Sequence, residues 1–184
     1  MARTGLRPLP PSRAQLQMTF DLQALQVPAC AMPPGYEIRA FGPGDRHRWL
    51  DLLNAHNEFG VLTPPSFERD VTDLLISGGG VGVFHAEDLI ATASVCDLPA
   101  FRPAATLMFV VVDPRHRGLR LGTASTAAAM SVAAEAGYPS VVLHTDDHRD
   151  AALRTYLGMG FEPALDHSAD APERWAVVLA RIRD

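Results

Sequence analysis

The stretch Ala105–Val112 (Ala-Thr-Leu-Met-Phe-Val-Val-Val) constrains the fold of this chain more than any other segment. It is almost entirely apolar, so it lacks the alternation that marks a strand with one face in water. Such a run, ended by the turn signal Asp113-Pro114, is typical of a strand buried on both faces. A strand of this kind lies inside a sheet with helices packed on either side. We therefore expect an α/β domain.

Turn residues and apolar spacing divide the chain after residue 35 into strands and helices. Pro43 and Ser66 are expected to open the first two helices, and the glycine run 78–80 to end the second. The expected strands are residues 36–41, 81–85, 89–98, 105–112, 140–145, 161–164 and 174–182. The expected helices are residues 43–57, 66–76, 121–136 and 150–157. No internal repeat and no second core are visible, which indicates one domain.

Residues 1–35 differ from the rest because they are rich in proline. Proline disfavours helices and central strands. We expect an N-terminal extension that is partly ordered at most, followed by a domain over residues 36–184. Residues 15–20 alternate between polar and apolar side chains. They either add a strand to the edge of the sheet or belong to a disordered tail.

Length and charge limit the classes of function. The chain has 184 residues, 47% hydrophobic and 20% charged, which fits one globular domain. The net charge of −5, without a basic cluster, argues against a nucleic-acid partner. No apolar run approaches the roughly 20 residues that span a bilayer, and no secretory signal is visible. We expect a cytoplasmic protein that binds neither nucleic acid nor membrane, with Cys30 and Cys96 as reduced thiols.

A candidate phosphate-binding turn follows the apolar strand. Residues 117–122 (Arg-Gly-Leu-Arg-Leu-Gly) lead into the third helix. Helix N-termini bind phosphate through unpaired N–H groups, and glycines let a ligand approach the backbone. Arg117 and Arg120 add charge-assisted donors. The turn lacks the ending of a P-loop and the three-glycine dinucleotide fingerprint. Taken alone, it is equally compatible with an ordinary turn bearing solvated arginines.

This turn resembles the acetyl-coenzyme A signature of the GNAT acetyltransferase superfamily: Arg or Gln, two residues, Gly, one residue, then Gly or Ala. Arg117 and Gly122 match it. Arg120 stands where the middle glycine is usual, which makes the loop bulkier and more cationic.

A second stretch resembles the family's later motif, in which Asn precedes Ala-x-x-x-Tyr and then Gly-Phe. Ala152, Tyr156 and Gly160-Phe161 fit, and Arg149 takes the position of the Asn. Two motifs in the family's order are more specific than either alone. The resemblance covers most of the chain after residue 35.

The resemblance implies the GNAT fold, an α/β fold with a mixed, mostly antiparallel sheet and flanking helices. The central strands Ala105–Val112 and Ser140–Thr145 would be parallel and splay apart. Acetyl-CoA would be the co-substrate, its pantetheine arm would enter the gap, and no metal would be needed. A homodimer is compatible with the family. The implied coenzyme contacts are Val110, Val111, Val112, Arg117, Gly118, Leu119, Arg120, Leu121, Gly122, Thr123 and Arg149.

The implied reaction is direct transfer of acetyl from a thioester to an amine of a small molecule or protein. Tyr156 stands at the family's tyrosine position and is the candidate acid that protonates the leaving thiolate. His144 is the candidate catalytic base, because a histidine pKa suits the task. Asp97 and His116 are weaker candidates, and Asp113 is read as a turn former.

Several alternatives remain open at the level of sequence. His144 and Tyr156 could also be ordinary structural residues. The histidines and aspartates of residues 144–148 match no strong template for a metal site. The strand Ala105–Val112 carries no carboxylate, so a non-catalytic module that senses acetyl-CoA is the main alternative to an N-acetyltransferase. An unrelated α/β domain is a third. The acceptor amine cannot be read from the sequence.

Overall fold

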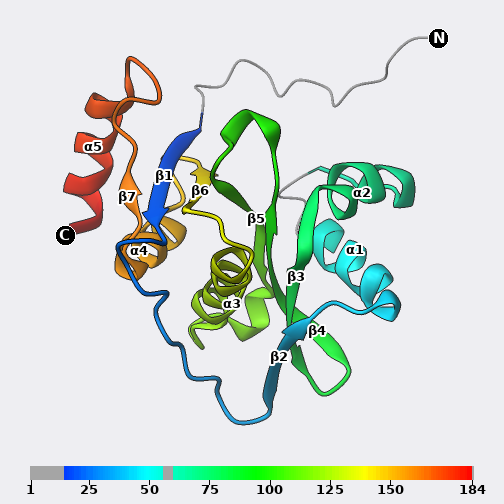
Figure 1. Ribbon diagram of the computed structural model, residues 1–184. Coiled ribbons are helices and arrows are strands. Elements are labelled where there is room, and N and C mark those ends of the chain that lie inside the picture. The colour runs from blue at the N-terminus through cyan, green and yellow to red at the C-terminus, as the bar shows by residue number, and fades with distance from the viewer. Residues whose placement is uncertain (1–14, 56–59, 184) are drawn as a thin grey trace.

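Seven strands form one sheet in the computed structural model, which describes residues 15–55 and 60–183 (Figure 1). The strands are β1 (Leu16–Asp21), β2 (Tyr36–Ala40), β3 (Leu75–His85), β4 (Asp88–Cys96), β5 (Ala105–Val112), β6 (Ser140–Thr145) and β7 (Glu162–Pro163). Their order across the sheet is β2-β3-β4-β5-β6-β1-β7. Neighbours are antiparallel except β5 and β6, which are parallel. The expected mixed sheet with one parallel central pair is confirmed.

Helices cover both faces of this sheet (Figure 1). The α-helices are α1 (Arg46–Ala55), α2 (Pro64–Asp70), α3 (Leu121–Glu135), α4 (Asp150–Met159) and α5 (Ala171–Arg183). Short 3-10 turns are η1 (Pro43–Asp45), η2 (Thr72–Leu74), η3 (Pro99–Phe101) and η4 (Pro114–His116). The first helix was expected to run to residue 57, and that end lies outside the described residues.

Two apolar layers hold the sheet between its helices. On one face, Trp49 of α1 and Phe67 of α2 pack in a cluster with Phe84 of β3. On the other, Met130 of α3 packs with residues of β3, β4, β5, β6 and β1. Each fully buried large side chain contributes about 1.5–3 kcal/mol, so these layers fix the sheet and with it the loops at its ends.

The last strand was predicted wrongly. Residues 174–182 form part of α5, in which Trp175 and Val178 are buried and Leu179 and Ile182 are half-buried. Apolar residues three and four apart line one face of a helix, and this spacing decides against a strand.

The N-terminal segment supplies β1, which lies inside the sheet between β6 and β7. Residues 15–20 were predicted as an edge strand or a tail, and β1 is a strand but not an edge. It pairs with β6 on one side and with β7 on the other. Leu16, Met18 and Phe20 are at most 1% exposed, so alternate residues of β1 belong to the core.

The second expected helix, residues 66–76, was also predicted to be too long. It begins earlier, with Thr63 as N-cap and Ser66 at the third helical position, and β3 starts at Leu75. The glycines 78–80 do not end a helix but lie within β3. A Cβ on Gly80 would come within 3.0 Å of Phe41, so the missing side chain lets an aromatic ring lie across the strand.

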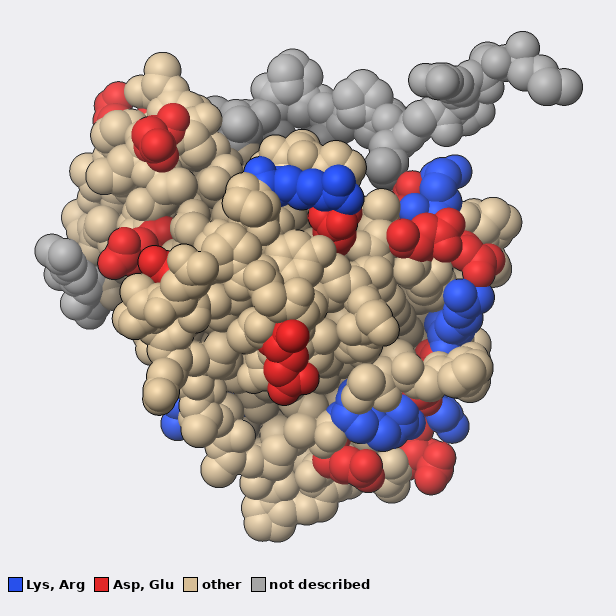
Figure 2. Space-filling model, in the orientation of Figure 1, with Lys and Arg blue, Asp and Glu red and all other residues tan. Residues whose placement is uncertain are grey.

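The surface of the molecule mixes charges of both signs. On the face seen in Figure 2, Arg side chains lie beside Asp and Glu side chains. Many of these neighbours form ion pairs, such as Arg46 with Glu68 and Arg102 with Asp97. None of the helices in the described ranges is both long enough and apolar enough to cross a membrane.

Candidate active site

The site begins where the two parallel strands separate. β5 pairs with β6 only through Ala105, Thr106 and Leu107, which lie opposite residues 141–143. Beyond Leu107, β5 keeps its antiparallel pairing with β4 but is no longer paired with β6. The edge of β5 from Met108 onward therefore faces a gap in the sheet, as the expected splay requires.

A β-bulge marks the point of separation. Thr92 pairs with Val111 and Ser94 with Met108, so two residues of β5, Phe109 and Val110, face one residue of β4. Phe109 has a φ of 52°, in the left-handed region that bulky residues avoid. Strained residues and bulges gather at functional sites, where they redirect the chain.

The bulge also changes which side of the sheet the following side chains of β5 point to. Without it, Leu107 and Phe109 would point to the same side of the sheet. Instead Leu107 packs with the α3 layer, whereas Phe109 and Val111 pack with α1 and α2. The bulge therefore changes the direction of the main chain at residues 108–110, where the pairing of β5 with β6 ends.

The loop between β5 and α3, residues 113–120, carries the candidate phosphate turn. Asp113 accepts hydrogen bonds from the Arg115 backbone N–H (2.9 Å) and from its guanidinium (2.7 Å), which confirms it as a turn former. These bonds to Arg115 lower the pKa of Asp113 to about 2. Gly118 and Arg120 both have positive φ, 81° and 60°. The position at which Arg120 replaces a glycine thus has the conformation for which glycine is favoured.

The end of this loop is open to solvent. Residues 117–120 are exposed, and among the described residues the guanidinium groups of Arg117 and Arg120 form no ion pair. The first bond of α3 runs from the Ala124 N–H to the Arg120 carbonyl, so the N–H groups of Leu121, Gly122 and Thr123 have no acceptor within the helix. A Cβ on Gly122 would lie 3.3 Å from Val112, so little room remains there. These features fit the binding of a diphosphate.

Residues of β2 and of the segment before it contact this turn. The Tyr36 hydroxyl and the Nδ1 of His116 are 2.7 Å apart, which ties β2 to η4. Tyr36 and Met32 also pack on the cluster that contains Leu121, the first residue of α3. His116 therefore holds the turn in place.

The two principal catalytic candidates lie on α4 and β6. Tyr156 is 8% exposed and packs against Phe161, with ring centroids 5.7 Å apart. His144 is half-buried, and its ring lies 4.8 Å from that of Phe101. Burial, with a smaller effect of His167, lowers the pKa of His144. A lowered pKa favours the neutral imidazole, which is the form that can accept a proton.

Other chemistry has less support. Asp97 forms a two-point ion pair with Arg102 that lowers its pKa, which makes it a weak base. Both cysteines are free, and burial raises the pKa of Cys96 to about 12, so that thiol is not a nucleophile at neutral pH. In the part of the chain that the structure describes, no three His, Cys, Asp or Glu residues gather to hold a metal ion.

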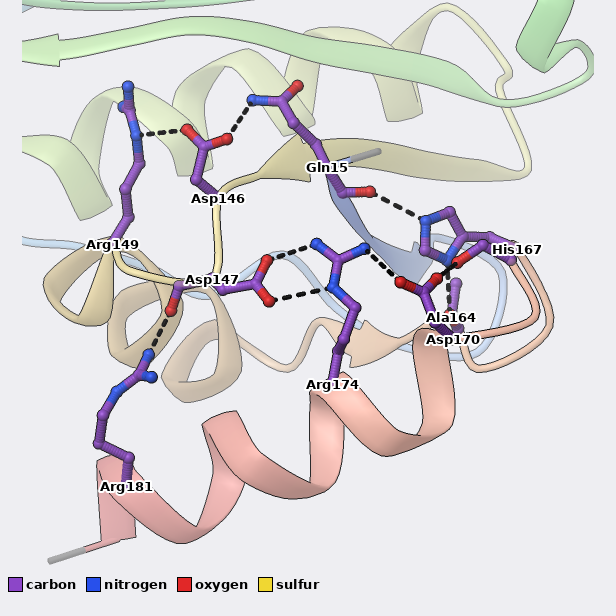
Figure 3. Close-up of polar contacts among 10 residues, drawn as sticks. Gln15, Asp146, Asp147, Arg149, Ala164, His167, Asp170, Arg174 and Arg181 are labelled. Atoms are coloured by element: carbon purple, nitrogen blue, oxygen red, sulfur yellow. Dashed lines mark hydrogen bonds and ion pairs between the residues drawn. The ribbon is translucent and has the colours of Figure 1, made fainter. Parts of the chain in front are cut away.

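Arg149, at the family's Asn position, belongs to a network that sequence reasoning missed (Figure 3). Its Nε donates to Asp146 at 3.0 Å, and Asp146 also accepts from Gln15 of the N-terminal segment at 3.2 Å. The next residue, Asp147, is held by Arg174 of α5. No local signal identifies these partners, because Gln15 and Arg174 lie far from the loop in sequence.

Comparison with known proteins agrees with this geometry. The model of the acetyltransferase (GNAT) family matches residues 46–161. The mycothiol acetyltransferase of Sanguibacter keddieii is 32% identical over 148 residues, which are 75% of this chain and 47% of that protein. That of Nocardia farcinica is 30% identical over 177 residues, 89% of this chain and 56% of that protein. The chain thus spans about half the length of the curated relatives it matches.

The fold itself is found among solved structures. A GCN5-related N-acetyltransferase from Sphaerobacter thermophilus superposes with a TM-score of 0.69 at 18% identity. The match covers 82% of this chain and 49% of that one.

Proposed function

Since this chain belongs to the acetyltransferase (GNAT) family, we propose that it transfers acetyl from acetyl-CoA directly to an amine of a small molecule. The observation that carries the proposal is the open N-terminus of α3 beside the gap between β5 and β6. There, unpaired N–H groups, two cationic side chains and a glycine come together. The relatives named mycothiol acetyltransferase favour a small-molecule acceptor over a protein.

The residues divide the binding of the donor between them. The N–H groups of residues 121–123, with Arg117 and Arg120, would hold the pyrophosphate. The main chain of Val110–Val112, on the edge of β5 that is no longer paired with β6, would pair with the pantetheine arm. Arg149 would contact the coenzyme from the opposite side of the gap.

The chemistry needs a neutral amine and a good leaving group. A free alkylamine has a pKa around 10, so a base must remove a proton during attack on the thioester carbon. His144 would accept that proton, directly or through water. As the carbon–sulfur bond breaks, the Tyr156 hydroxyl would donate its proton to the departing thiolate. Acetyl is then joined to nitrogen, and coenzyme A leaves as the thiol.

Thiol release from acetyl-CoA, measured over a panel of amines that includes deacetylated mycothiol, tests this function. We expect release with at least one amine. Tyr156→Phe should lower kcat about 100-fold with little change in the affinity for acetyl-CoA, because the lost proton acts only in the transition state. Tyr138→Phe is the matched control, since Tyr138 follows the other end of α3, and it should retain full activity.

Two outcomes would contradict the proposal in different ways. Binding of acetyl-CoA without thiol release on any amine would favour the sensing module. An unchanged kcat in Tyr156→Phe would remove Tyr156 from the chemistry and leave it a core residue.

A further inference from the structure

The loop between β6 and α4, residues 146–149, is bound from below by α5 (Figure 3). Arg174 Nε donates to Asp147 Oδ2 at 3.0 Å, and its Nη2 donates to the other oxygen of the same carboxylate. Arg181, two turns further along α5, donates to the backbone carbonyl of Asp147 and forms an ion pair with Asp150 at 2.6 Å. Two arginines of α5 thus hold both the side chain and the main chain of this loop.

The same loop is held on its other side through Asp146. One oxygen of Asp146 accepts from Gln15, the residue before β1, and the other from Arg149 at 3.0 Å. The Gln15 carbonyl is in turn 2.9 Å from the Nε2 of His167. In Figure 3 the Arg149 side chain extends away from α5, whereas Arg174 and Arg181 reach toward the loop from α5. The orientation of Arg149 therefore depends on the position of the loop.

Packing of α5 does not require this charge. Ala171, Trp175 and Val178 are at most 1% exposed and attach the helix to the core. The Arg174 side chain is only 5% exposed and that of Asp147 is 32% exposed, so the pair is desolvated mainly at the arginine. Such pairs seldom add more stability than an apolar residue of similar size, and their best-supported use is to fix one geometry. A geometric role for Arg174 is accordingly favoured over a stabilising one.

We propose that Arg174, with Arg181, is a positioning residue for coenzyme binding: by fixing Asp147 it sets the loop 146–149 and the direction of Arg149. This inference rests on the proposed function, because it takes acetyl-CoA as the ligand that Arg149 contacts. It assigns to α5 a role in binding the donor, although α5 itself lies on the far side of the loop.

The test is a double-mutant cycle read by calorimetry with acetyl-CoA. Arg174→Met keeps an apolar stem of similar length and should raise Kd roughly 10-fold, since small displacements of a binding group have effects of this size. In the Arg149→Ala background the same change should raise Kd less than about twofold, because the group it positions is gone. Arg174→Lys keeps the charge but not the two-point contact, and should give an intermediate loss of roughly threefold.

Arg154→Gln is the matched control. Arg154 also joins α4 to α5, donating to the Ile182 carbonyl at 3.2 Å, but does not touch the loop. Its removal should leave Kd unchanged, and thermal melting of every variant checks that it is folded. An equal loss for Arg174→Met in both backgrounds, or no loss with a folded Arg174→Lys, would overturn the inference alone. Absence of acetyl-CoA binding by the unaltered chain would overturn the proposed function and this inference with it.

Discussion

The two loops that follow the parallel strands are built in opposite ways. In the β5–α3 loop, residues 113–120, Asp113 is bound by Arg115 of the same loop and His116 by Tyr36 of β2, while residues 117–120 are exposed. The β6–α4 loop, residues 146–149, is held by Gln15, which precedes β1, and by two arginines of α5. Both loops open a helix at the same gap. One leaves its N–H groups and cations available, and the other is fixed by long-range ion pairs.

This difference indicates a division of labour in binding. An exposed turn with free donors can supply attraction for an anion, but its long arginine side chains must be ordered when the ligand binds. A loop that is already fixed presents its contact at no such cost. We therefore expect changes in the first loop to act on direct contacts, and changes around the second to act through orientation.

Gly122→Val should have the largest effect on the binding of acetyl-CoA by the β5–α3 loop. A branched side chain would fill the first turn of α3, where a Cβ already meets Val112 at 3.3 Å, and would occupy the space proposed for the phosphates. We expect the affinity for acetyl-CoA to fall about 100-fold in calorimetry, which corresponds to the loss of one or two charge-assisted hydrogen bonds.

Gly158→Val serves as its control, because Gly158 is also helical, on α4, with open space around it. It should lose some stability through helix propensity but retain affinity. An unchanged affinity in folded Gly122→Val would rule out this turn as the phosphate site.

Asp113→Asn should show how far the open loop depends on its own ion pair. The pKa of Asp113 is lowered to about 2, so its stabilisation is fully present above the ordinary carboxylate pKa near 4 and is lost as pH falls toward 2. The Arg115 side chain is 81% exposed, so screening reduces the effect to about 1 kcal/mol at pH 7. Urea unfolding at pH 7, 5 and 3 should show the difference between variant and parent shrinking at the lowest pH. A difference that stayed constant with pH would assign it to the lost Asp geometry instead of the charge.

Arg120→Gly should have the smallest effect and the opposite sign on stability. A left-handed residue other than glycine is strained, and glycine relieves this at some cost in the entropy of the unfolded chain. We expect a gain in the free energy of unfolding of no more than about 1 kcal/mol, together with a few-fold weaker binding of acetyl-CoA. Gly118→Ala, at φ 81°, should be destabilised in the same urea assay. A less stable Arg120→Gly would mean that the arginine stem packs usefully in the loop.

Local patterns predicted the centre of the fold well. The bounds of β5 and β6 match the expectation, because a continuous apolar run and a strand between two turn signals have little alternative. The end of the chain was predicted wrongly as a strand, although Trp175, Val178 and Ile182 follow a helical period. The glycine run of β3 was also misread, because Gly80 lies where Phe41 crosses the strand, a contact that only the folded sheet reveals.

On the donor side, the prediction of the candidate site depends on one local pattern in the sequence. Two glycines and two arginines at the start of a helix mark the turn at residues 117–122 in the sequence. The left-handed conformation of Arg120 and the bulge at Phe109 leave no mark of their own in the sequence, since neither residue is glycine. The partners of Asp146 and Asp147 come from both ends of the chain, and single-sequence patterns carry no information on such distant contacts.

The interior position of β1 has a consequence for how the chain acquires its structure. Leu16 pairs with Thr145, so β1 must wait during synthesis for a partner strand that is made much later in the chain. Pairing β1 with β6 closes a large loop of chain. The entropy lost in closing this loop comes before the stabilising contacts form, which slows folding. Until β6 emerges, Leu16, Met18 and Phe20 have no core to enter, and these apolar side chains stay open to wrong partners. The nascent chain should therefore depend on chaperones at β1 until β6 is made.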